Sequence, residues 1–421
     1  MSMEQKNIAV IGGGVSGIVA AYLLSKKYQV TLLEQNDYLG GHTNTRYVTN
    51  EQGEKLPVDT GFIVFNYQTY PNFIKFIRQL GVEEIDAPMT FAYHNRKTGI
   101  QYSSVVPQGL FADWKNLFRP SFLRMLLEIL SFSKQALYDL AHTDLSGLTL
   151  GSYIKEKKFS REFINYYLIP MAAAVWSSPK TKVLDFPCYS FLSFYNNHGM
   201  LDLKHQLQWK TIKGGSIKYV EAFKKVFNGK IRLSARVKQV LRQGESVKVQ
   251  LADGSSQPFD AVVIAAHADQ ALALLADPDD QEKRILGSWS YSTNETALHT
   301  DPAVMPRSKR AWGAWNYFDT GEPSPQVALT YYMNLLQSLP GRTDYFVSLN
   351  SRQMIDGSKI RYETVYHHPL YDFKALASQK DLPLLKPDRN TFFCGSYCYH
   401  GFHEAAVKAA CKVAGHFGVG L

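Results

Sequence analysis

The sequence lacks the features that mark several classes of protein. None of its apolar runs reaches 18 residues, so we expect no membrane-spanning helix. The start, Met1–Asn7, has no apolar signal core, and we therefore expect a protein that is not exported. The four cysteines fit neither a disulfide framework nor a zinc pattern, which favours a reducing cytoplasm.

Motifs for several kinds of chemistry are also missing. The sequence has no G-x-S-x-G elbow, no H-E-x-x-H and no G-x-x-x-x-G-K-[ST]. No metal site is predicted. The net charge of +9 comes from scattered basic residues, so we expect no nucleic acid as a partner. The content of 45% hydrophobic and 20% charged residues is typical of a globular protein, and the length of 421 residues indicates more than one domain.

A glycine-rich turn near the start is the most informative feature that the sequence does contain. Gly12, Gly14 and Gly17 fit the pattern G-x-G-x-x-G, with Val15 and Ser16 between the last two. In such a turn the first glycine permits the tight bend, the second lets the backbone approach a pyrophosphate, and the third lets a helix pack on the preceding strand.

The surroundings of this turn fit a dinucleotide-binding unit. The β-branched run 8–11 before it predicts a buried parallel strand, and the apolar stripe after it predicts a helix. A second strand over 29–33 ends in Glu34, whose carboxylate would accept hydrogen bonds from an adenosine ribose. The order of strand, glycines, helix, strand and acid therefore predicts that the chain binds a dinucleotide.

Three separated segments have the pattern of nucleotide-binding α/β structure. We predict that 1–66, 210–275 and 385–421 form one cofactor domain, and that 67–209 and 276–384 form a substrate domain. In the middle segment, strands are expected over 231–241, 246–251 and 260–266, with a helix from His267. A final helix is expected from about His403.

Four further motifs carry a family resemblance. They are Glu34-x5-Gly40-Gly41-His42, Asp59-Thr60-Gly61, Lys213-Gly214-Gly215 followed by Val237, and the closing stretch from Gly395 to Glu404. With the glycine turn, they resemble the FAD-dependent amine oxidase and phytoene desaturase superfamily over nearly the whole chain. Within it, the sequence is most similar to bacterial predicted NAD/FAD-binding oxidoreductases associated with fatty-acid modification.

This resemblance implies a fold, a cofactor and a set of cofactor contacts. The implied fold is α/β (α+β overall): a Rossmann-type FAD-binding domain built from three segments, with an inserted mixed substrate domain. The implied FAD contacts are Gly12, Gly14, Val15, Ser16, Gly17, Glu34, Gly40, Gly41, His42, Thr43, Asp59, Gly61, Val237, Gly395, His403, Glu404 and Ala406. Two positions depart from the family pattern, because His42 stands where most members have Arg and Ser396 where most have an acid.

The closing helix has a physical logic of its own. A helix that begins near His403 presents unpaired amides and about half a positive charge at its N-terminus. Directed at the flavin N1/C2 carbonyl region, it would stabilise the negative charge that reduction places there. For the side chains of His403 and Glu404, an ordinary place at the start of a helix is an equal alternative.

The inserted segments indicate the kind of substrate. Aromatic residues crowd 163–195 with few charges, which fits either a hydrophobic core or a large apolar cavity. Phe62, Trp315 and Tyr399 are the predicted walls near the flavin ring, and no catalytic residue is assigned. The stretch 117–130 fits either a core helix or one that rests on a bilayer, so a peripheral place on the inner face of the membrane is an alternative to a purely cytoplasmic one.

Three functions remain open from the sequence. The chain takes a hydride from an apolar lipid or acyl-chain substrate to create or move a double bond, it oxidises a small amine, or it is a non-catalytic flavin-binding accessory protein. No second glycine fingerprint follows a strand, so no NAD(P)H domain is expected. The electron acceptor is therefore left open among oxygen, a quinone, a protein partner and the substrate itself.

Overall fold

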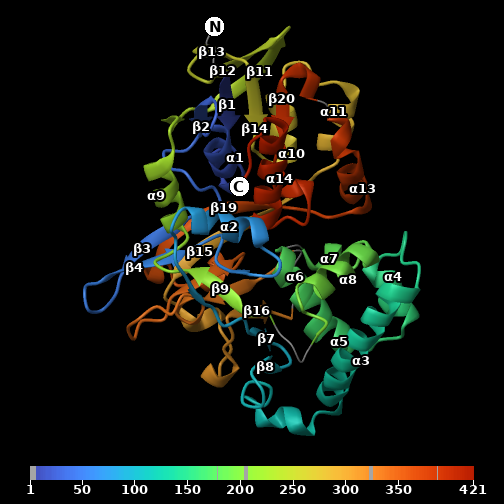
Figure 1. Cartoon of the computed structure of the whole chain (residues 1–421). Helices are drawn as coiled ribbons and strands as arrows, with labels where there is room; N and C mark the ends of the chain where they lie inside the picture. The colour runs from blue at the N-terminus through green and yellow to red at the C-terminus, as the bar shows by residue number, and fades with distance from the viewer. Residues whose placement is uncertain (1–5, 178, 203–206, 322–325, 386) are drawn as a thin grey trace.

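In the computed structural model, the chain forms an α/β part, a large mixed sheet and a layer of helices (Figure 1). The structure describes residues 6–177, 179–202, 207–321, 326–385 and 387–421. Most of Met1–Asn7, on which the expectation about export rests, lies outside these residues. Within the described ranges, no helix is both long enough and apolar enough to cross a membrane.

A parallel sheet in the upper part of Figure 1 takes its strands from distant parts of the sequence. Neighbouring strands all pair in parallel. In spatial order the strands are β10 (Lys230–Arg232), β2 (Gln29–Leu33), β1 (Asn7–Ile11), β14 (Ala261–Ile264) and β20 (Thr391–Phe393). The predicted fold class, a Rossmann-type sheet assembled from three segments, is confirmed.

Both faces of this sheet are covered, which explains its continuous apolar strands. Side chains alternate between the faces of a strand. Ile8 and Val10 of β1 pack with the helices α1 (Val15–Leu24) and α14 (His403–His416). Ala9 and Ile11 pack on the opposite face, in the core that also contains an antiparallel meander. The meander consists of β11 (Val237–Gln243), β12 (Ser246–Leu251) and β13 (Ser256–Phe259).

The single strand predicted over 231–241 is wrong, because the chain forms two strands there. β10 joins the parallel sheet beside β2, whereas β11 belongs to the meander. Between them Ser234 adopts a left-handed conformation with φ of 51°, and its amide donates to the carbonyl of Asn36. The chain turns at this point because the two strands serve different sheets, which the apolar pattern alone does not show.

A seven-stranded sheet lies below the parallel one in Figure 1. In order its strands are β19 (Ile360–Pro369), β15 (Tyr291–His299), β18 (Phe346–Leu349), β17 (Leu329–Tyr332), β16 (Trp315–Asp319), β7 (Phe91–Asn95) and β8 (Gln101–Ser103). It unites strands from 67–209 with strands from 276–384, through the parallel pairing of β7 with β16. The domain boundaries themselves stay a prediction.

Two small sheets connect these parts. One is the hairpin β3 (Thr45–Thr49) and β4 (Lys55–Asp59), and the other joins β5 (Phe65–Asn66), β9 (Trp209–Ile212) and β6 (Glu84–Asp86). The remaining helices of the α/β part and the large sheet are α2 (Pro71–Gln79), α9 (Ile217–Val226), α10 (Ala268–Leu274), α11 (Asp280–Leu286), α12 (Met333–Leu336) and α13 (Phe373–Asp381).

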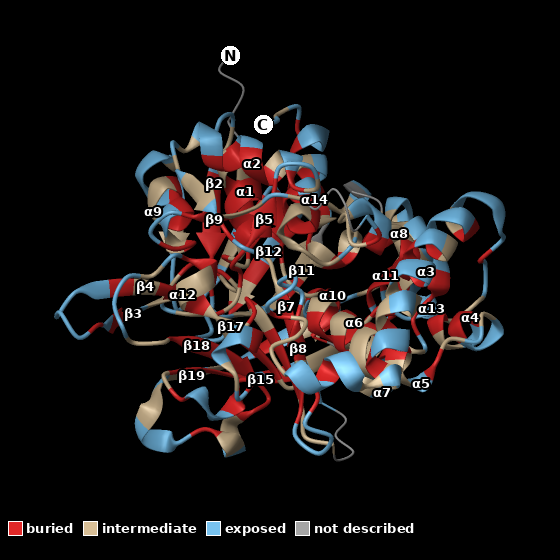
Figure 2. Ribbon diagram, turned by 90° about the horizontal axis from the view of Figure 1, so that it is seen from below, coloured by how far each residue is buried: buried red, intermediate tan, exposed pale blue. Residues whose placement is uncertain are grey.

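A layer of helices covers one side of the large sheet (Figure 1). It contains α3 (Pro120–His142), α4 (Leu150–Glu156), α5 (Arg161–Phe163), the π-helical turn η2 (Ile164–Leu168), α6 (Ile169–Trp176), α7 (Lys180–Val183) and α8 (Cys188–Asn197). Its inner side chains join one hydrophobic core with the meander and part of the large sheet. Figure 2 shows the buried residues gathered inside and the exposed ones along the outer helix faces.

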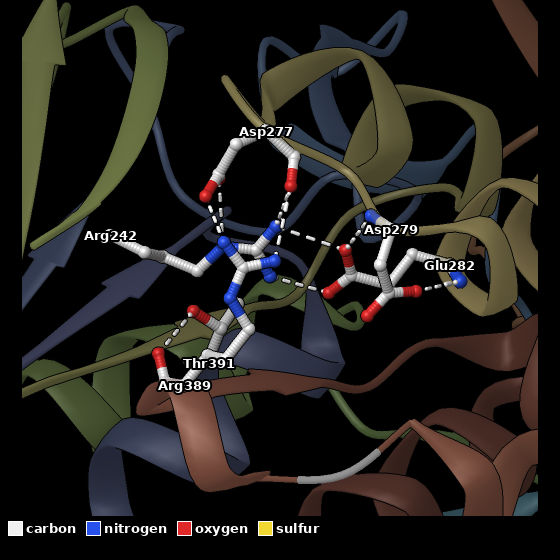
Figure 3. Close-up of polar contacts among 6 residues, drawn as sticks. All are labelled: Arg242, Asp277, Asp279, Glu282, Arg389 and Thr391. Carbon is white, nitrogen blue, oxygen red and sulfur yellow. Dashed lines mark hydrogen bonds and ion pairs between the residues drawn. The ribbon is translucent and has the colours of Figure 1, made fainter. Parts of the chain in front are cut away.

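A buried ion-pair network ties the meander to the segment before α11 and to β20 (Figure 3). Arg242 of β11 donates through Nη1 and Nη2 to the two carboxylate oxygens of Glu282, at 2.5 and 2.9 Å. Its Nε donates to Asp277 at 3.0 Å, and Asp277 also accepts from Arg389 just before β20. Only 3% of the Arg242 side chain and 7% of the Glu282 side chain are exposed.

Candidate cofactor site

The glycine turn has the backbone geometry that a pyrophosphate site needs. Gly12 has φ of +104°, and a Cβ on it would lie 2.4 Å from the carbonyl oxygen of Ala265. A Cβ on Gly17 would lie 1.8 Å from the carbonyl oxygen of Gly12. By contrast, a Cβ on Gly14 would meet nothing within 4 Å. Positions 12 and 17 therefore need glycine because a side chain there would clash with the protein's own backbone. Gly14, by contrast, borders open space at the N-terminus of α1.

The second glycine motif lies directly against the first. The Gly40 amide donates to the carbonyl of Gly13 at 2.8 Å, and a Cβ on Gly41 would come within 3.3 Å of the Gly14 Cα. The buried Ser16 hydroxyl, in the first turn of α1, has no hydrogen bond of normal geometry among the described residues. Free amides at a helix N-terminus, an open approach and an unused hydroxyl fit a bound phosphate group.

Glu34 holds the turn from the end of β2. One carboxylate oxygen accepts from the Gly13 amide at 2.6 Å and the other from the Asn36 amide at 2.9 Å. The acid therefore lies at the cofactor end of the strand, where the sequence places it. Its contact with a ribose stays a prediction.

His42, which follows the two glycines, lies among other aromatic side chains. Its ring stacks on Tyr366 of β19 at 4.9 Å between centroids, and the rings of His368 and His267 lie 5.4 and 6.2 Å away. Burial, followed by the proximity of His267, lowers the pKa of His42 to about 4. Burial likewise lowers the pKa of His267 to about 4 and that of His368 to about 3. These imidazoles are therefore neutral at pH 7.

Asp59 is a buried acid whose carboxylate joins several segments through hydrogen bonds. Its carboxylate accepts from the Ser216 amide and hydroxyl, from the Thr45 hydroxyl and from the Gln337 amide group. Burial raises the pKa of Asp59 to about 6 against the opposing effect of these donors. The predicted Asp59 and Lys213–Gly215 motifs are thus brought together, with Ser216 as the link.

Gly61 and Val237 occupy different surroundings. A Cβ on Gly61 would lie 2.2 Å from the carbonyl oxygen of His42, so the chain after Asp59 passes close to the second glycine motif. Val237 begins the meander at a point where its pairing with β12 shifts register. Their contacts with FAD stay predictions.

The closing motif connects α14 to α2 and to the second glycine motif. Glu404 accepts from the Asn72 amide at 3.2 Å and the Phe73 amide at 2.9 Å, so its carboxylate caps the first turn of α2. Burial lowers the pKa of His403, and its Nε2 lies 3.1 Å from the Thr43 hydroxyl. Both side chains thus have partners within the chain, and the backbone at the start of α14 is what remains for a cofactor.

The rest of the closing motif is closely packed. Gly395 allows a tight approach, because a Cβ there would lie 2.9 Å from the carbonyl oxygen of Ala266. Ala406 is buried within the first turns of α14. The aromatic residues of the helical layer contact this motif through Phe194 of α8. The Phe194 ring stacks on the Phe402 ring with 5.1 Å between centroids.

The three predicted wall residues lie in different environments. Phe62 stacks on His403 with 3.5 Å between centroids. Trp315 of β16 packs edge-on against Tyr331 of β17 at 5.3 Å. Tyr399 lies beneath the ammonium group of Lys408 at 4.3 Å, beside α14. The structure brings Phe62 and Tyr399 to the two sides of the same closing motif and places Trp315 in the large sheet.

Several aromatic side chains lie deep in the fold but are not fully covered. Burial raises the pKa of Tyr167 to about 12 and raises that of Tyr331, yet both rings keep some accessible surface. The rings of His42 and His368 show the same combination of low pKa and remaining accessibility. These partly covered side chains, beside the second glycine motif and in the inserted segments, have surface left for contact with a bound molecule.

The sequence reasoning missed the residues that surround His42. His267 follows β14 directly, and the carboxyl end of a parallel strand is where such sheets bind ligands, so its position was a usable signal. Tyr366 and His368 are two residues apart on β19 and therefore share a face. Nothing in the sequence shows that this face meets His42. Among the described residues, no group of three or more His, Cys, Asp or Glu is arranged to hold a metal ion.

Comparison with known families gives the class of the protein. The model of the flavin containing amine oxidoreductase family matches residues 15–363. The chain therefore belongs to this family. Its members are FAD-dependent oxidoreductases, so the predicted class and the predicted cofactor are confirmed.

Individual relatives are more distant. The chain is similar to Probable polyamine oxidase 4 of Arabidopsis thaliana, with 25% identity over 328 residues, which is 72% of this chain and 59% of that relative. The chain thus spans less than two thirds of the length of this curated relative.

Two solved structures show the same fold. A fatty acid isomerase from P. acnes, described as producing CLA, superposes with a TM-score of 0.69 and 16% identity, covering 99% of each chain. Putrescine oxidase bound to putrescine gives a TM-score of 0.68 and 12% identity over 98% of this chain and 99% of the other. At these identities the likeness establishes the two-domain flavoprotein fold.

We expect the affinity for FAD to fall as pH rises. The His42 ring is neutral without a ligand, and the nearby negative charge of a pyrophosphate would favour its protonated form and raise its pKa in the complex. Binding then takes up a proton, so the affinity falls by up to about tenfold per pH unit between the pKa of unliganded His42, about 4, and the higher pKa in the complex, and it levels off above the latter. FAD titrations of the apoprotein, with calorimetry in two buffers to count protons, measure this effect.

Two variants test the assignment to His42. His42→Arg carries a permanent charge and should bind FAD with little dependence on pH. His416→Arg, at the far end of α14, should keep the wild-type slope. A wild-type affinity that does not change with pH would contradict the role given to His42.

Proposed function

We propose that the chain takes a hydride from carbon in an apolar, lipid or acyl-chain substrate, to create or to move a double bond. Bound FAD would supply the hydride acceptor. The residues predicted to contact it would hold it between the two glycine motifs and the start of α14. The observation that carries the proposal is a group of aromatic side chains, Tyr167, Trp315 and Tyr331, that lie deep in the fold without being fully covered.

This group comes from different elements of the fold. Tyr167 belongs to the π-helical turn η2, a distortion that occurs frequently at functional sites. The residue before it, Tyr166, is held by Tyr102, whose hydroxyl donates to the Tyr166 carbonyl at 2.7 Å. Trp315 and Tyr331 come from the large sheet. Such walls exclude water and bind a hydrocarbon chain through apolar burial, without a dedicated charge.

The ionisable groups around His42 favour a neutral or anionic substrate. The ionisable groups that act on His42, His267 and His368 are other histidines. Each lowers the pKa of its neighbours, as expected where no carboxylate offsets the repulsion. A cationic amine would gain little from this environment, whereas the carboxylate of a fatty acid would accept a hydrogen bond from a neutral imidazole N–H group.

The chain's own residues would position the cofactor and the substrate. The start of α14 would place its free amides toward the ring system and stabilise negative charge there. Glu404 supports this arrangement by fixing α14 to α2. Phe62, Trp315 and Tyr399 are proposed to contact the ring or the substrate, and no side chain is assigned as general base.

Two fates of the hydride fit this chain. Its return to the same substrate would give isomerisation, as the name of the fatty acid isomerase from P. acnes describes for that protein. Its transfer to an external acceptor would give desaturation. We propose the former, because it requires no separate acceptor site.

We expect anaerobic linoleate to be converted by the purified holoenzyme. Chromatography of the extracted lipid should show a shifted double bond, with the flavin absorbance returning to its oxidised level after the reaction. Persistent bleaching with a desaturated product would support external transfer instead. Unchanged linoleate and unchanged flavin would contradict the proposed substrate class.

A flavin amine oxidase is the second candidate. It is favoured by the resemblance to Probable polyamine oxidase 4 and by the fold of putrescine oxidase. Anaerobic bleaching by putrescine or spermidine, and not by linoleate, would establish it. A flavin that neither class reduces, in a protein that copurifies with a lipid-modifying enzyme, would point to the accessory role.

We also propose a cytoplasmic chain in peripheral contact with the inner face of a membrane. An acyl-chain substrate is concentrated in the bilayer, so an enzyme that uses it gains by resting on the surface.

A further inference from the structure

The η1–α3 segment carries an exposed apolar surface with no cover in the structure. The 3-10 turn η1 (Trp114–Phe118) and the start of α3 lie at the lower end of the molecule in Figure 1, far from the parallel sheet. Trp114 is 65% exposed, Phe118 75% and Leu127 67%. Exposed apolar side chains also include Val105, Val106, Leu117, Leu123, Leu130, Leu137 and Tyr138.

The helix α3 is apolar on two opposite sides. Its inner side packs Phe122, Met125 and Phe132 into the core that contains Tyr167 and Trp315. Its outer side presents Leu123, Leu127 and Leu130, spaced at i, i+4 and i+7 along one stripe. A surface helix of a soluble domain normally has polar residues there, so this outer stripe indicates a second apolar environment.

Within residues 104–142 the exposed charged side chains all have one sign, and the first exposed acid, Asp144, comes just after α3. Within residues 104–142, every one of which the structure describes, Asp113, Glu128 and Asp139 are buried or half-buried. Each of these acids is paired, with Arg119, Arg124 and Lys157 respectively. The exposed charged side chains are Lys115, Arg124 and Lys134.

From these observations we propose that η1 and the outer face of α3 dock the protein on an anionic lipid bilayer. Trp114, Phe118 and the leucine stripe would enter the interface, and the basic side chains would contact lipid phosphates. This inference rests on the membrane contact within the proposed function and assigns it a surface and a lipid chemistry.

A second copy of the chain is a poorer occupant of the same surface. In a two-fold symmetric dimer, the same patch lies on both sides of the interface. Lys115 and Lys134 would then face the same basic residues of the partner copy, whereas Arg124 is already paired with Glu128. An anionic bilayer provides both the apolar layer and the opposite charge.

The test is sedimentation of the holoenzyme with vesicles. We expect strong binding to phosphatidylcholine vesicles that contain phosphatidylglycerol, weaker binding to phosphatidylcholine alone, and loss of the difference at high salt. Phe118→Glu with Leu127→Glu should weaken binding by at least about tenfold while the flavin content stays unchanged. Tyr189→Glu, which replaces an equally exposed aromatic residue on α8, should bind as the wild type does.

Separate readouts distinguish the possible failures. A blue shift of tryptophan fluorescence on vesicle binding that is absent in Trp114→Phe places η1 in the interface. No vesicle binding, or equal binding by the double variant, overturns the docking surface even if free linoleate is still converted. A dimer in gel filtration that the double variant abolishes would overturn the bilayer in favour of a second copy. Vesicle binding without conversion of linoleate would leave the docking surface standing and overturn the substrate proposal alone.

Discussion

Gly14→Ala should fold normally and bind FAD at least about 100-fold more weakly than the wild type, which corresponds to about 2.7 kcal/mol. The chain itself has room for the new methyl group, because a Cβ at Gly14 meets nothing within 4 Å. Its backbone has φ of −73° and ψ of 178°, which alanine adopts without strain. The methyl group would instead stand in the space through which the pyrophosphate approaches the start of α1.

The measurement is a fluorescence titration of apoprotein with FAD, together with thermal unfolding of both apoproteins. Gly415→Ala is the matched control, since that glycine, near the end of α14, likewise has open space around it and is distant from the glycine turn. The control should keep the wild-type affinity. Equal FAD affinity of Gly14→Ala and wild type would remove the glycine turn from the cofactor site.

Arg242→Ala should lower the free energy of unfolding by about 3 kcal/mol or more, since it leaves the buried Glu282 carboxylate without its partner. The loss also frees Asp277, which would keep only Arg389. Chemical denaturation followed by far-UV circular dichroism measures the effect. The expected change exceeds that of a typical surface substitution several-fold.

Two further variants isolate the buried charge as the cause. Arg352→Ala breaks the exposed pair with Glu363 and should cost less than about 1 kcal/mol. Arg242→Met combined with Glu282→Leu removes both charges and should be more stable than Arg242→Ala alone. If the double variant is less stable than the single one, desolvated charge is not the reason for the loss.

The α/β part could be predicted well because its signals are local. The turn at Gly12–Gly17 needs glycine for reasons internal to the chain, and an apolar strand stands on each side of the helix that follows. The large sheet was not predicted as a unit. The pairing of β16 with β7 joins residues more than 200 positions apart, and no local pattern encodes it.

The candidate site divides in the same way. The glycine turn was found from its spacing and the second glycine motif from the family resemblance, and the structure brings the two into contact. The partners of side chains were not predictable, as Glu404 shows: its carboxylate caps α2, although its place in the closing motif suggested the cofactor. The histidines around His42 were missed because they converge from β14 and β19, whose relative position depends on the whole fold.

The origin of the parallel sheet has a consequence for synthesis on the ribosome. β1 and β2 emerge first, but the other neighbour of β1 is β14, some 250 residues later, and β20 follows after nearly 130 more. The glycine turn is therefore synthesised early, but the sheet that supports it is complete only after β20 has been synthesised. During most of translation its apolar strands have an unpaired edge, which exposes them to aggregation and to chaperones. Cofactor binding would thus report that synthesis has passed β20, and a nascent chain stalled before that strand should carry no flavin.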